Sequence, residues 1–185
     1  MILSKLIGTG KSIFTIDDVS SILNIDNKNY LRVLLVRMTK RQDLIRLRRG
    51  IYTYRQDYDI YELANKLKTP SYVSLERVLF DNSVIFQDSS KTITSVSNNH
   101  ISFVVDKINF TYNKIQNGIL TNPLGVIVDK NARIATTERA ICDMIYVSKN
   151  YYFDNLEKVD KKKLLEMSKI YNKRVIKEIK TLCST

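Results

Sequence analysis

The chain has 185 residues, of which 44% are hydrophobic and 26% are charged, a composition typical of a globular protein with one or two cores. Its 2 cysteines are too few for a disulfide framework or a cysteine-rich metal site, and its first residues lack the pattern of a secretory signal. No apolar run approaches the roughly 20 residues that span a bilayer. Composition therefore argues against the disulfide-rich secreted and membrane classes and predicts a cytoplasmic protein without a membrane partner.

The charge is distributed unevenly along the chain. Its 30 Lys and Arg residues against 19 Asp and Glu residues give a net charge of +11. Residues 1–55 have 11 basic and 4 acidic residues, residues 56–150 have 10 of each, and residues 151–185 have 9 basic and 5 acidic residues. Basic ends around a neutral middle indicate a polyanionic partner, with a solvated basic face as the alternative.

The first two predicted elements are short helices. Residues 2–7 form the first, which ends at Gly8. Thr15, followed three residues later by Asp18, is a capping-box arrangement, and apolar residues at helical spacing follow it. A second helix is therefore predicted to begin after Thr15 and to end at Asn24.

A longer helix is predicted over residues 27–41, followed by a hairpin with Gly50 at its bend. The helix has apolar residues at i, i+3, i+4 and i+7, which predict one buried stripe made of Leu31, Leu34, Leu35 and Met38. Three helices followed by a two-stranded ribbon are the order of a winged helix-turn-helix. In that fold the third helix enters the DNA major groove and the ribbon reaches the backbone.

The face of this helix opposite Leu31 has side chains that suit groove readout. Asn can pair with adenine, Arg with guanine, and a valine methyl can touch the thymine methyl. In the ribbon, Arg46 and Arg48 are predicted to share a face, with Arg49 at the turn for phosphate contact. The predicted DNA-binding residues are Lys28, Asn29, Arg32, Val33, Val36, Arg37, Lys40, Arg41, Arg46, Arg48 and Arg49. The alternative is a winged helix used only for protein contacts, with its arginines solvated.

The composition changes near residue 58, which predicts a winged-helix domain over residues 1–57 and an α+β domain over residues 58–185. In the second domain a helix is predicted before Pro70 and another one opened by Ser71. Period-two segments then predict a small antiparallel sheet, with the strands TITSVS, ISFVV, INFTY and VIV. The segment TTERAICDMIY and one or two amphipathic segments over residues 154–182 are predicted to be helical.

The C-terminal helices are basic. They have no interleaved aromatic residues that would favour stacking on single strands, so any contact with nucleic acid would be electrostatic. Two interpretations of the basic residues are possible: a solvated helix face, or a surface that contacts a toxin or nucleic acid. The residues concerned are Lys161, Lys162, Lys163, Lys169, Lys173, Arg174 and Lys177.

Four blocks of the sequence, spanning roughly residues 12–147, resemble AbiEi-type antitoxins: FTIDDVSSIL, LLVRMTKRQDLIRLRRGIYTY, YELANKLKTPSYVSLERVLF and RIATTERAICDMIY. The resemblance rests on the linked order of the blocks. One departure is Asp43, where related wings often have Gly. The resemblance implies the antitoxin and autorepressor of a type IV toxin–antitoxin (abortive infection) operon, a phage-defence system. Such a protein binds inverted repeats in its own promoter and counters a nucleotidyltransferase-like toxin.

The sequence offers little material for catalysis. His100 is the only histidine, and GTGKS lacks the spacing of a phosphate loop. Glu138, Arg139 and Asp143 are expected to be structural. No catalytic residue, metal ligand or cofactor is therefore predicted, and the protein is expected not to be an enzyme. The second hypothesis is a nuclease that uses the winged helix for targeting and residues 60–185 for chemistry, although the middle region lacks an Asp/Glu–Lys cluster.

Overall fold

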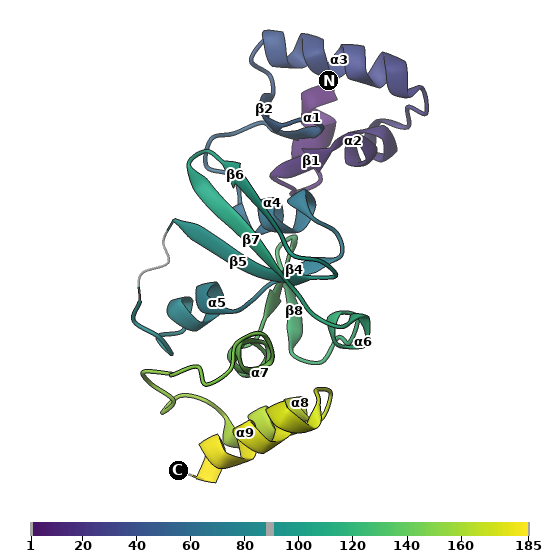
Figure 1. Ribbon diagram of the computed structural model, residues 1–185. Helices are drawn as coiled ribbons and strands as arrows, with labels where there is room; N and C mark the ends of the chain where they lie inside the picture. The colour runs from purple at the N-terminus through teal and green to yellow at the C-terminus, as the bar shows by residue number, and fades with distance from the viewer. Residues whose placement is uncertain (1, 88–90, 185) are drawn as a thin grey trace. The chain divides into compact units, whose positions relative to one another are not determined.

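The computed structural model describes residues 2–87 and 91–184 and has two compact units, Met1–Leu67 and Lys68–Thr185 (Figure 1). Helices and strands occur in both units, so the α+β class predicted from the sequence is confirmed. The boundary follows Leu67, ten residues after the one expected from composition.

The N-terminal unit surrounds one small sheet with helices. Its strands lie in the order β1-β3-β2, and both pairings are antiparallel. Figure 1 shows α3 and α4 on opposite sides of this unit. The elements in chain order are α1 (Ile2–Ile7), β1 (Ile13–Thr15), α2 (Ile16–Leu23), α3 (Lys28–Lys40), β2 (Ile45–Arg48), β3 (Ile51–Thr53) and α4 (Ile60–Leu67).

Local hydrogen bonds explain where α2 begins and ends. Thr15 Oγ1 accepts the backbone N–H of Asp18 at 3.1 Å, and Asp18 Oδ2 accepts the backbone N–H of Thr15 at 2.9 Å. This is the capping box that the sequence predicts, and it satisfies two N–H groups that the helix leaves unpaired. Asn24 ends the helix in the left-handed conformation, with φ of 55°.

Helix α3 is fixed by a cap at its start and by the core along one side. The Asn27 side chain accepts the backbone N–H groups of Asn29 and Tyr30. Leu31, Leu35 and Met38 are buried, as the predicted stripe requires. They belong to a core cluster with Leu6, Phe14, Val19, Leu44 and Tyr52, and Leu34 packs partly buried against it.

The hairpin β2–β3 turns at Gly50, whose φ of +82° favours glycine. A bulge lies between Arg46 and Arg48, so that Arg46 pairs with Tyr52 and Arg48 with Ile51. Adjacent residues of a strand point to opposite faces. The prediction that Arg46 and Arg48 share a face is therefore wrong, because it assumed strict alternation without a bulge.

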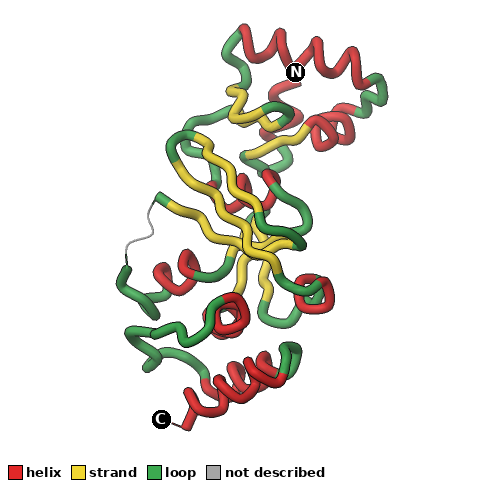
Figure 2. The backbone as a smooth tube through the Cα atoms, viewed as in Figure 1, coloured by secondary structure: helices red, strands yellow, loops and turns green. Residues whose placement is uncertain are grey.

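The C-terminal unit contains a six-stranded sheet in the order β6-β7-β5-β4-β9-β8. Its strands are yellow in Figure 2. The pairs β5–β7 and β4–β9 are parallel and the others are antiparallel. Helix α7 contacts α5 and β9, and α8 and α9 pack on α7. The elements are β4 (Ser71–Val73), α5 (Glu76–Asp81), β5 (Thr92–Ser97), β6 (Ile101–Val105), β7 (Ile108–Lys114), α6 (Asn117–Leu120), β8 (Val126–Asp129), β9 (Ala132–Ala135), α7 (Thr137–Val147), α8 (Lys161–Ser168) and α9 (Lys173–Ser184).

Two predictions about this unit are wrong. The sheet is larger than expected and mixed rather than antiparallel. The segment opened by Ser71 is strand β4, and the helix α5 begins only at Glu76. All three residues of β4 are buried, so the strand has no solvent-exposed face and does not show the period of two by which half-buried strands are recognised.

Candidate nucleic-acid interface

The side of α3 that faces away from the core is exposed to solvent. The thirteen residues of α3 include no Asp or Glu. The side chains of Val33 and Val36 are 49% and 52% exposed, and Tyr30, which sequence reasoning did not select, is 53% exposed. The spacing of three residues between Tyr30 and Val33 is the signal that could have identified Tyr30 from the sequence. The predicted residues Lys28, Asn29, Arg32, Arg37, Lys40 and Arg41 are exposed as well.

Two of the predicted base-reading side chains contact each other. Arg32 Nη1 donates a hydrogen bond to Asn29 Oδ1 at 3.3 Å. Asn29 Oδ1 is the acceptor that a bidentate contact with adenine uses. Arg32 thus orients the amide so that its NH₂ group points away from the guanidinium, and the two side chains form one polar unit at the start of the helix.

Lys28 differs from the other cations of this face because it has an acidic neighbour. Its Nζ lies 3.2 Å from Asp17 Oδ1, and the two side chains are 64% and 80% exposed. Exposed pairs of this kind contribute little to stability, but they lower the local positive charge. The free positive charge of the face is therefore concentrated further along α3.

The hairpin contributes Arg46, Arg48 and Arg49, and all three side chains are exposed. Its start is anchored to α3, because the backbone N–H of Asp43 bonds to the carbonyl oxygen of Met38 at 3.0 Å. The bulge pairs Arg46 and Arg48 with consecutive residues of β3, Tyr52 and Ile51, and Arg49 lies in the turn between β2 and β3. These three arginines can contact phosphates.

Buried and half-buried polar groups hold the rest of the unit in place. Lys66 Nζ donates to Asp18 Oδ2 at 2.8 Å, and Lys11 Nζ donates to Oδ1 at 3.1 Å. Burial by itself raises the pKa of the Asp18 carboxyl, but the hydrogen bonds from Lys66, Thr15 and Lys11 outweigh it and keep this pKa well below its ordinary value. The buried Glu62 accepts the N–H and hydroxyl of Ser12 at 2.8 and 2.7 Å. These contacts attach α4 to β1 and α2.

The basic C-terminal helices have a different character. The predicted surface residues Lys161, Lys162, Lys163, Lys169, Lys173 and Lys177 are exposed. Arg174, by contrast, is half-buried and is used internally: it donates to Glu178 Oε1 and to the carbonyl oxygen of Tyr146, both at 2.9 Å.

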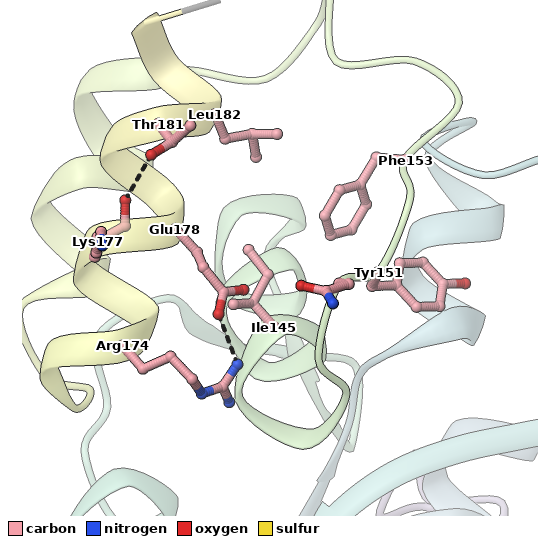
Figure 3. A pocket seen from close by; sticks show the side chains of 9 residues that line it. Ile145, Tyr151, Phe153, Arg174, Lys177, Glu178, Thr181 and Leu182 are labelled. Atoms are coloured by element: carbon pink, nitrogen blue, oxygen red, sulfur yellow. Dashed lines mark hydrogen bonds and ion pairs between the residues drawn. The ribbon is translucent and has the colours of Figure 1, made fainter.

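A hollow of about 490 Å³ lies beside Arg174 and Lys177, between α9 and the segment that contains Tyr151 and Phe153 (Figure 3). Ile145 forms part of its floor. Its lining combines the apolar and aromatic side chains of Tyr151, Phe153 and Leu182 with polar ones, among them Glu178, which is paired with Arg174. Arg174 thus stabilises the fold through internal contacts, whereas Lys177, which lines the same hollow, is exposed.

The pair Arg139 and Asp143 lies inside the C-terminal unit and has no exposed surface. Asp143 accepts hydrogen bonds from Ser74 Oγ at 2.8 Å, Tyr171 OH at 2.7 Å and Tyr72 OH at 3.2 Å. Burial raises the pKa of the Tyr171 phenol, and the charge of Asp143 raises it further, so the phenol remains a donor. The network joins β4, α7 and the turn before α9, which is the structural role expected for these residues.

Comparison with known proteins returned no matching family model and no matching curated protein. Within residues 2–87 and 91–184, no group of three His, Cys, Asp or Glu side chains is placed to hold a metal ion. None of the helices in the same two stretches is long and apolar enough to cross a bilayer.

Proposed function

We propose that the N-terminal unit is a winged helix-turn-helix and that the chain is a DNA-binding repressor. The observation that carries this proposal is the outward face of α3, which combines exposed Asn29, Arg32, Val33, Val36 and Arg37 and has no acidic residue. The order α1-β1-α2-α3-β2-β3 agrees with the winged-helix arrangement, in which α3 is the recognition helix and β2–β3 is the wing.

The dimensions and charges of the unit suit double-stranded DNA. A helix of 13 residues fits the major groove, which is about 12 Å wide, and presents hydrogen-bonding and methyl groups to base edges. Arginines at the ribbon tip supply phosphate contacts, which provide affinity without sequence preference. The two kinds of contact come from successive segments of the chain, so one docking arrangement can use both.

We further propose that the protein is a non-enzymatic AbiEi-type antitoxin and autorepressor of a type IV toxin–antitoxin operon. The support is the linked order of the four sequence blocks that resemble this family. On this proposal the DNA partner is an inverted repeat in its own promoter, and the functional partner is a nucleotidyltransferase-like toxin. No cofactor is required.

Mobility shifts on the upstream DNA of its own gene, beside a scrambled duplex, test the DNA-binding proposal. Replacing Asn29 or Arg32 with Ala should weaken specific binding by about 1–3 kcal/mol and leave binding to the scrambled duplex nearly unchanged. Replacing Arg48 or Arg49 should weaken binding to both duplexes and reduce the salt dependence. Lys114→Ala removes one exposed charge from the C-terminal unit and should change neither.

Two results would contradict the proposal. Equal losses on both duplexes for every α3 and hairpin variant would show that α3 does not read bases. Cleavage of supercoiled plasmid in Mg²⁺ or Mn²⁺, with multiple turnovers, would favour the nuclease hypothesis instead. Location of a nucleotidyltransferase gene directly beside this one is the corresponding check on the operon.

A further inference from the structure

Two valines occupy the middle of the outward face of α3. Val33 and Val36 are 49% and 52% exposed, although they belong to a helix whose other side is tightly packed. At 100° per residue they lie about 60° apart and on either side of the direction opposite Leu31. Val33 and Val36 thus form a small apolar centre on a face whose other side chains include Asn29, Arg32, Arg37 and Lys40.

The surroundings of the valines favour DNA over a protein surface. Asn29 precedes them and Lys40 follows them along the same face, while Arg32 and Arg37 lie on its two flanks. The centres of protein–protein interfaces are depleted in charged residues. An apolar centre bordered on both sides by guanidinium groups instead matches a groove with phosphate walls and an apolar group on its floor.

The major groove has one such apolar group, the C5 methyl of thymine. We propose that Val33 and Val36 contact the methyl groups of two nearby thymines, so that the bound sequence is defined partly by methyl recognition. This inference rests on the proposed DNA-binding function and specifies which bases the same site reads. The polar pair of Asn29 and Arg32 then reads the base edges at the start of the helix.

The spacing of the valines limits where the thymines lie. Three residues advance a helix by about 4.5 Å, and one base pair advances the duplex by about 3.4 Å. Thymines on neighbouring base pairs therefore satisfy both contacts. Removing one buried methyl group should lower affinity about fourfold, and removing both about fifteenfold.

The test replaces thymine by uracil, which deletes the methyl group and leaves the pairing edge intact. The full chain is first footprinted on its upstream DNA, and duplexes are then made with deoxyuridine at each thymine of the footprint in turn. One or two positions should lower the affinity of the unchanged protein about fourfold each. The double variant Val33→Ala, Val36→Ala should bind the thymine and uracil duplexes equally.

Val104→Ala is the matched control, because Val104 is 73% exposed and lies on β6 of the C-terminal unit. This variant should keep the full thymine preference. A footprint without thymines, or uracil duplexes bound as tightly as thymine duplexes, would overturn the inference. So would a change of oligomeric state in the Val33→Ala, Val36→Ala variant, because the valines would then contact protein.

The DNA-binding proposal and the thymine inference fail in different ways. If the chain binds duplex DNA with a salt dependence that requires Arg48 and Arg49 but shows no uracil effect, only the thymine inference is wrong. If no duplex is bound, the DNA-binding proposal and the inference that depends on it are both wrong.

Discussion

Asp17 and Asp18 are neighbours at the beginning of α2, yet their surroundings differ. The side chain of Asp17 is 80% exposed and pairs with the exposed Lys28, whereas that of Asp18 is 12% exposed and accepts from Lys66, Lys11 and Thr15. Because these donors keep the pKa of Asp18 below its ordinary value, ionised Asp18 stabilises the folded state. That contribution is present above the unfolded pKa of about 4 and is lost as the pH falls toward the folded value.

Replacing Asp18 with Asn should therefore lower the thermal unfolding temperature at pH 7, because the ion pairs and half of the capping box are lost. The difference from the unchanged protein should narrow as the pH falls below about 4, since protonation then removes the same charge. Thermal unfolding between pH 2 and pH 7 measures both effects. Asp17→Asn is the control and should have little effect at any pH; identical pH profiles for the two variants would contradict the assignment.

Arg139 and Asp143 provide a second contrast at the scale of the residue. Replacing Asp143 with Ala should cost about 3–5 kcal/mol of stability, because it leaves a buried guanidinium without its counterion. Asp81→Ala breaks the Arg77–Asp81 pair, which has the same i,i+4 spacing, and should cost less than about 1 kcal/mol because that pair is partly exposed. Urea unfolding measures both variants, and comparable costs would show that burial does not govern this pair.

At the scale of the element, α3 ends in a motif that usually contains glycine. Gln42 has a φ of 63°. The backbone N–H of Gln42 donates to the carbonyl oxygen of Thr39 at 3.1 Å, and the backbone N–H of Asp43 donates to the carbonyl oxygen of Met38 at 3.0 Å. These are the two hydrogen bonds of a Schellman cap, with Gln42 at the left-handed position. The left-handed residue thus directly precedes Asp43.

Replacing Gln42 with Gly should raise the stability of the protein by roughly 0.5 kcal/mol, because glycine adopts this conformation without the Cβ penalty. Part of the gain is offset by the greater freedom of glycine in the unfolded chain. The expected result is a small increase in thermal unfolding temperature with unchanged DNA affinity. Gln56→Gly, at an exposed position without positive φ, should be neutral or destabilising; a similar gain there would refute the explanation.

How much of each element was predictable depends on how local its signal is. The helices α2 and α3 were predicted because their caps and apolar stripes lie within a few turns of chain. Strand β4 was not, because its residues are all buried and its pairing with β5 and β9 joins distant segments. The bulge at Arg46–Arg48 and the burial of Arg139 likewise depend on tertiary packing, which spacing alone does not encode. The exposed face of α3 was predictable, since it is the reverse of a clear stripe.

At the scale of the whole molecule, the structural boundary after Leu67 differs from the boundary at residue 57 that composition predicts. Helix α4 follows the expected boundary at residue 57 but belongs to the N-terminal unit, where Glu62 bonds to Ser12 and Lys66 to Asp18. Charge patterning could not place it, because these contacts join residues about fifty positions apart. The consequence for experiments is that a cut after residue 57 removes α4 from its partners.

The proposed antitoxin activity can be separated from DNA binding by cutting the chain at the structural boundary. Residues 68–185 should unfold cooperatively as an isolated fragment and should rescue growth when they are co-expressed with the toxin of the operon. Residues 58–185 should be less soluble, because Leu63 and Ala64, which are buried in the N-terminal unit, become exposed.

In the full chain, reversing the charges of Arg46, Arg48 and Arg49 should abolish repression of a promoter reporter and leave rescue intact. If rescue is lost both in the soluble 68–185 fragment and in the charge-reversed chain, antitoxin activity depends on DNA binding and the proposed division of labour is wrong. If only the fragment fails, the N-terminal unit contributes to rescue through surfaces other than the hairpin.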